Sequence, residues 1–91
     1  MLVLTRRLGQ KIMAGDSPIT VVAFGKKFVR IQAGSRIFSL RVGEGQQVYA
    51  NVFVTLVDVR FGQIKLGIKA PNHIAIHREE IYQKIKEELA A

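Results

Sequence analysis

The sequence changes character twice within Ala70-Pro71-Asn72-His73-Ile74-Ala75-Ile76-His77-Arg78-Glu79-Glu80-Ile81-Tyr82. Pro71 fixes φ and disfavours helix at the preceding residue, so the start of the stretch predicts a turn. Residues 73–77 alternate, with both isoleucines on one face and His73, Ala75 and His77 on the other, which predicts a short strand. An isoleucine or leucine then recurs at every fourth position, which predicts a C-terminal helix over residues 79–89. Arg78 therefore stands between a strand and a helix, where its guanidinium is well placed to meet a ligand.

The rest of the chain consists of short apolar, often β-branched stretches, most of them separated by turns that contain Gly. Such stretches predict strands joined by tight connections. Many short strands and one terminal helix predict an all-β, sheet or barrel-like fold in a single domain, residues 1–91. A chain of this length buries only a little over ~60% of its unfolded surface, so a partner subunit would help to stabilise it. The expected strands are residues 2–5, 11–14, 19–24, 28–32, 36–42, 52–59, 64–69 and 73–77.

Charge is distributed unevenly along the sequence. Residues 1–78 carry twelve Lys or Arg and three acidic residues, a net charge of +9, whereas residues 79–91 carry two Lys and four Glu, a net of −2. A basic body favours a polyanionic partner, because neutralising phosphates releases counterions. A charged, solvated surface without a nucleic-acid partner is the alternative interpretation.

The composition argues against several classes of protein. Without cysteine the chain has no disulfide or thiolate metal site, and two histidines with scattered acids form no nucleophile-base set or metal-ligand cluster. We therefore expect no enzyme activity, no catalytic residues, no metal and no cofactor. Four apolar residues precede Arg6, too few for a signal peptide, and no stretch approaches a membrane span. The expected location is the cytoplasm.

The best candidates for ligand contacts are Arg6, Arg7 and Arg78. Arg6 and Arg7 end the first expected strand, where successive side chains point to opposite faces, so one can bind a ligand while the other braces the structure. Arginine matches phosphate and the acceptor edge of guanine with two hydrogen bonds, which lysine does not do. Ordinary surface arginines at strand ends remain the alternative.

Two motifs together resemble the carbon storage regulator (CsrA/RsmA) family of small bacterial RNA-binding proteins. The chain opens with the pattern MLxLTRRxG and ends with APxxxAxHREEIYxxI, and the resemblance covers residues 1–16 and 51–87. It implies an intertwined, strand-exchanged homodimer, in which the first strand of one protomer lies beside the last strand of the other. It also implies two equivalent sites that bind a GGA triplet in hairpin loops of mRNA leaders.

By position, the resemblance implies one RNA-binding set. On the first strand it comprises Leu4, Thr5, Arg6 and Arg7, and near the last strand it comprises Ala70, Pro71, Ile74, Ala75, Ile76, His77 and Arg78.

Residues 17–50 depart from the family pattern and are treated as inserted strands. They form either an extra hairpin and strand, or a decayed duplicate of the early strands with Leu40-Arg41 in place of Arg6-Arg7. Residues 3–10 do align with residues 37–44, as a repeat would. Similar hairpins also share such patterns, so both interpretations stay open.

The predicted function is sequence-specific mRNA binding that represses translation or alters message lifetime. The partners implied are GGA-containing mRNA hairpins, small regulatory RNA, a second subunit and a protein antagonist. A protein-interaction module that binds a family subunit or another protein is the alternative, and a nucleic-acid binder without sequence preference is a third possibility.

Overall fold

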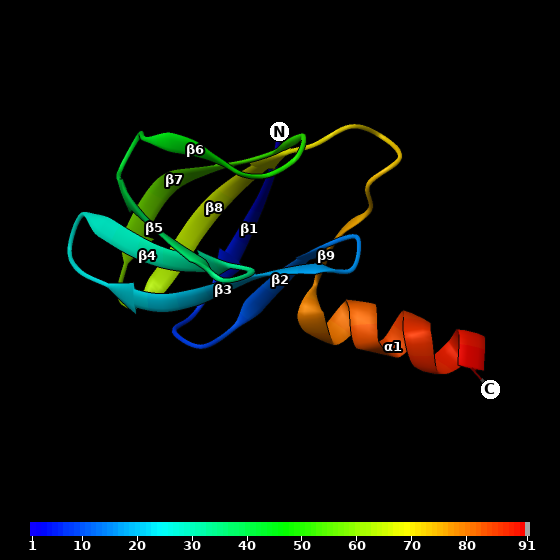
Figure 1. Cartoon of the computed structure of the whole chain (residues 1–91). Helices are drawn as coiled ribbons and strands as arrows, with labels where there is room; N and C mark the ends of the chain where they lie inside the picture. Colours follow the sequence, from blue (N-terminus) through cyan, green and yellow to red (C-terminus); the bar gives the residue numbers. More distant parts are fainter. Residues whose placement is uncertain (91) are drawn as a thin grey trace.

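In the computed structural model, which describes residues 1–90, the chain forms two antiparallel sheets and one C-terminal helix (Figure 1). The prediction of an all-β fold with one terminal helix is confirmed. The elements are β1 (Leu2–Arg6), β2 (Lys11–Ala14), β3 (Ser17–Phe24), β4 (Phe28–Ala33), β5 (Arg36–Arg41), β6 (Gly45–Tyr49), β7 (Val52–Arg60), β8 (Gln63–Lys69), β9 (Ile76–Arg78) and α1 (Glu79–Ala90).

The two sheets pack through their apolar faces. One has the strand order β1-β8-β7-β6 and the other the order β5-β4-β3-β2-β9. Inward and outward side chains alternate most regularly in β4, where every second residue is buried while its neighbours are exposed. Most of the core residues are branched aliphatic residues from both sheets, among them Ile12, Val21, Ile31, Val54, Leu56 and Leu66. No helix in the described residues is long and apolar enough to cross a bilayer.

Residues 17–50, treated as inserted strands in the sequence, are divided between the two sheets. They supply β3, β4 and β5 to the five-stranded sheet and β6 to the four-stranded sheet. Both sheets therefore depend on this segment for hydrogen-bonded strands and for core residues.

The last strand is shorter than predicted. The expected strand over residues 73–77 begins only at Ile76. The backbone N–H of Ile74 donates to the carbonyl oxygen of Pro71 at 3.0 Å, so the chain is still turning at that point. The strand then continues directly into α1, whose first turn carries Glu79 and Glu80 at its positive end.

The first and last strands join different sheets. Leu4 of β1 lies opposite Leu66 of β8, and His77 of β9 lies opposite Met13 of β2. Figure 1 shows β2 and β9 side by side with α1 packed below them. Both terminal strands therefore find their hydrogen-bonding partners within one chain. The strand-exchanged homodimer stays a prediction.

Candidate nucleic-acid interface

The end of β1 is anchored to the start of α1 through Arg6. This side chain is only 1% exposed. Its Nη1 and Nη2 donate to Oε1 and Oε2 of Glu80, both at 2.9 Å, and Nη1 also donates to the carbonyl oxygen of Lys11 at 3.1 Å. An arginine does not lose its charge at any ordinary pH, so a buried guanidinium needs such a carboxylate partner. Arg6 therefore braces the structure.

Glu80 receives a second arginine. Arg78 Nε lies 3.2 Å from Glu80 Oε2, and the Arg78 side chain is 49% exposed. The hydrogen bonds from Arg6, more than any other cause, lower the pKa of Glu80 from 4.5 to about 2. The carboxylate thus stays ionised and joins two segments, Thr5-Arg6 and His77-Arg78, from opposite ends of the sequence.

Two strand edges are open next to this cluster. Among the described residues, β1 pairs only with β8 and β9 pairs only with β2, so one edge of each strand has no strand neighbour. Arg7, just beyond β1, is exposed. We call the free edges of β1 and β9, together with Arg7 and Arg78, the β1/β9 margin. Its backbone groups, the guanidinium of Arg7 and the guanidinium nitrogens of Arg78 other than the Nε that faces Glu80 can reach a ligand.

The structure brings most of the predicted site residues near this margin and leaves two aside. Ala70 and Pro71 line a separate open hollow with Phe53 and Lys69. Ala75 accepts a hydrogen bond from the backbone N–H of Gly15 at 2.8 Å, which fixes the approach to β9. By burial, Arg6 is enclosed; Arg7, Ala75 and Arg78 are exposed; and Leu4, Thr5, Ala70, Pro71, Ile74, Ile76 and His77 are intermediate.

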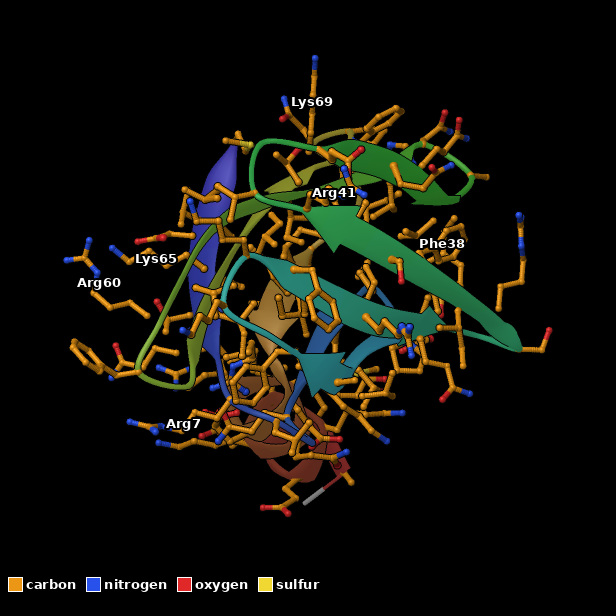
Figure 2. The ribbon with its side chains drawn as sticks, turned by 90° about the vertical axis from the view of Figure 1, so that its left-hand side faces the viewer. Arg7, Phe38, Arg41, Arg60, Lys65 and Lys69 are labelled. Carbon is orange, nitrogen blue, oxygen red and sulfur yellow. The ribbon has the colours of Figure 1, made fainter. Side chains whose placement is uncertain are left out.

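Further cations lie on the outer face of the four-stranded sheet. Lys65 and Lys69 of β8 are exposed, and Lys65 lies opposite Thr5 of β1. Figure 2 shows Arg7, Arg60 and Lys65 pointing outward along the left of the molecule and Lys69 pointing outward at the top. The sequence-based site did not include these lysines, although their alternation along residues 64–69 is the signal that places them on one face.

Comparison with protein-family models matches residues 37–87 to CsrA, described as a global regulator protein family. The match covers more than half of the chain. The chain belongs to the CsrA family. It is accordingly an RNA-binding post-transcriptional regulator, and RNA is its class of partner. The matched region begins inside the segment that the sequence analysis treats as inserted, since residues 37–41 form most of β5. No solved structure matches the chain.

Proposed function

We propose that this CsrA-family protein binds GGA-containing hairpin loops of mRNA leaders at the β1/β9 margin and thereby represses translation or changes message lifetime. One observation carries the proposal. Glu80 contacts both Arg6 and Arg78, so the TRR motif at one end of the chain and the HREE motif at the other meet at one carboxylate in the β1/β9 margin. A small regulatory RNA that displays the same triplet would compete for this edge.

The chemistry of the margin suits unpaired purines. Free strand edges present backbone N–H and C=O groups without partners, and bases in single-stranded loops expose the edges that such groups bind. The exposed guanidinium groups of Arg7 and Arg78 can each pair with the two acceptors of guanine or with a phosphate. Arg6 contributes by holding the strand and the helix together rather than by direct contact.

Lys65 and Lys69 extend the basic surface along β8 beside β1. Lysine binds phosphate as a point charge and does not select a base, so these residues would add affinity that weakens with salt. The β1/β9 margin would then select the GGA sequence, and the lysines on the sheet face would attract the RNA backbone of any sequence.

The test is a titration of the protein with a GGA hairpin and a matched GCA hairpin at moderate salt. We expect the GGA hairpin to bind more tightly by more than about 1 kcal/mol for each altered contact. Equal affinities would instead support a nucleic-acid binder without sequence preference. No binding to either RNA would support the protein-interaction module.

A pair of variants tests where recognition occurs. Arg78→Ala removes the exposed guanidinium of the margin, so we expect it to abolish most of the GGA preference. Lys26→Ala, in the turn between β3 and β4, is the matched control: we expect unchanged discrimination and a small, salt-dependent loss of affinity. Preserved GGA discrimination in Arg78→Ala would place the site elsewhere.

Cytoplasmic localisation, where mRNA leaders are translated, is part of the same proposal. Fractionation of cells that produce the tagged protein, followed by sequencing of the RNA that copurifies, would test it.

A further inference from the structure

We infer that the chain contains two CsrA-like units, residues 1–33 and 36–90, folded onto each other so that one RNA-binding margin is completed within a single chain and the second margin has been lost. The statement about RNA rests on the proposed function above. The statement about strand pairing rests on backbone geometry alone.

The two units repeat the same turn. The N–H of Gly9 donates to the carbonyl oxygen of Val21, and the N–H of Gly43 donates to that of Leu56, both at 2.8 Å. Returning bonds run from Val21 N to the Gln10 carbonyl at 3.1 Å and from Leu56 N to the Glu44 carbonyl at 3.0 Å.

A side chain closes the turn in the same way in each unit. Gln10 Oε1 accepts from the backbone N–H of Arg7 at 2.9 Å, and Glu44 Oε1 accepts from that of Arg41 at 2.7 Å. Gly9 and Gly43 both have positive φ, +83° and +91°, which glycine adopts without strain. Shared apolar patterning would not by itself reproduce these particular bonds.

The strand registers repeat as well. Leu4 lies opposite Leu66 where β1 pairs with β8, and Phe38 lies opposite Ile31 where β5 pairs with β4. Each first strand thus pairs with the fourth strand of the other unit. Both units also have an irregularity in strand register at the same place, at Val22 in β3 and at Val57 in β7. The structure is therefore a single-chain counterpart of an interlocked pair.

Only the second unit has a last strand and a helix. After β4 the chain turns through Gly34 and Ser35 directly into β5, so the first unit ends without them. Within the described residues, β6 accordingly pairs only with β7, whereas its counterpart β2 pairs with both β3 and β9.

The residues of β6 are those expected of a strand edge that faces solvent. Ile12 and Met13, buried where β9 covers β2, correspond to the exposed Gln46 and Gln47 of β6. Leu40 stands where the first unit has Arg6, so no buried guanidinium needs a carboxylate there. Both the capping strand and the residues that would accept it are missing from the edge formed by β5 and β6.

Introduced cysteines test the pairing without RNA, since the natural chain has none. Thr5→Cys/Lys65→Cys places a thiol pair across β1 and β8. Ser39→Cys/Arg30→Cys is the matched control, because it occupies the equivalent register in the β4–β5 hairpin. After oxidation we expect both variants to run as cross-linked monomers on a denaturing, non-reducing gel. A covalent dimer for Thr5→Cys/Lys65→Cys alone, or no cross-link while the control forms one, would overturn the inference.

A mixing experiment tests the site itself. Arg7→Ala and Arg78→Ala are unfolded together, refolded together and titrated with the GGA hairpin. If each site forms within one chain, the mixture binds no better than the two variants measured separately, which is the result that we expect. If sites form between chains, random pairing makes about half of the dimers mixed. One of the two sites in each mixed dimer has both arginines, so about a quarter of all sites would bind RNA again.

These outcomes separate the two proposals. Failure of the unaltered protein to bind the hairpin contradicts the proposed function, and the cross-linking result still decides the strand pairing. Restored binding in the mixture, with the unaltered protein active, contradicts completion of the site within one chain.

Discussion

Arg6 and Leu40 occupy the same place on β1 and β5, just before two similar turns, but have different surroundings. Arg6 is buried and its charge is balanced by Glu80, whereas Leu40 is buried in the apolar core. A buried arginine without a carboxylate would carry an uncompensated charge, and leucine fills the space without one. The residue at this position therefore reports whether a last strand and a helix lie beside it.

Glu80 should make folding stability depend on pH in the acid range. The pKa of Glu80 is lower in the folded chain, about 2 against 4.5, so the folded state binds fewer protons than the unfolded state within that window. The contribution of the Glu80 carboxylate to the free energy of unfolding is complete above pH 4.5 and declines as the pH falls toward 2. Glu80→Gln should remove this dependence and cost about 1–2 kcal/mol at neutral pH, a figure kept small because Glu80 is half exposed and solvent screens the pair.

Urea denaturation between pH 7 and pH 2 measures this effect. Glu88→Gln, on an exposed part of the same helix, is the control and should follow the unaltered protein. Equal stability of the unaltered protein and Glu80→Gln at neutral pH would mean that the Arg6–Glu80 pair contributes nothing.

At the scale of elements, β7 is the strand on which the four-stranded sheet depends. It lies between β6 and β8, and Leu56 is fully buried while the next residue, Val57, is 37% exposed. Leu56→Ala should lower the free energy of unfolding by about 2–5 kcal/mol through a cavity in the core. Val57→Ala should cost less than about 1 kcal/mol. Chemical denaturation of both variants gives the comparison, and similar losses would contradict the assigned strand faces.

The same strands mark the limits of prediction from sequence. The alternation of inward and outward side chains, together with turn residues, predicted most strands correctly. The apolar residues at every fourth position predicted α1. The sequence did not predict which strands pair, because β1 pairs with a strand as distant as β8 (Leu4 opposite Leu66) and any alternating strand offers similar side chains. The role of residues 17–50 was hidden for the same reason, and Leu40 in place of Arg6 weakened the one motif that would have shown the repeat.

At the scale of the whole molecule, the basic body and the acidic helix meet at one place. The net charge of +9 over residues 1–78 attracts polyanions, whereas Glu79 and Glu80 begin a helix with a net charge of −2. Glu80 draws Arg6 and Arg78 together, so the acidic element organises part of the basic surface instead of opposing it. The TRR and HREE motifs were visible in the sequence, but this shared carboxylate needed three-dimensional structure.

The two-residue connection at Gly34 and Ser35 has a consequence for transcripts that carry two GGA hairpins. A regulator with paired sites gains avidity by bridging both hairpins, since the second contact forms at a high effective concentration. This chain would occupy each hairpin independently and leave the intervening RNA unlooped. Competition binding should therefore give a two-hairpin RNA at most about a twofold statistical advantage over a single hairpin, and a gain of tenfold or more would reveal a bridging regulator.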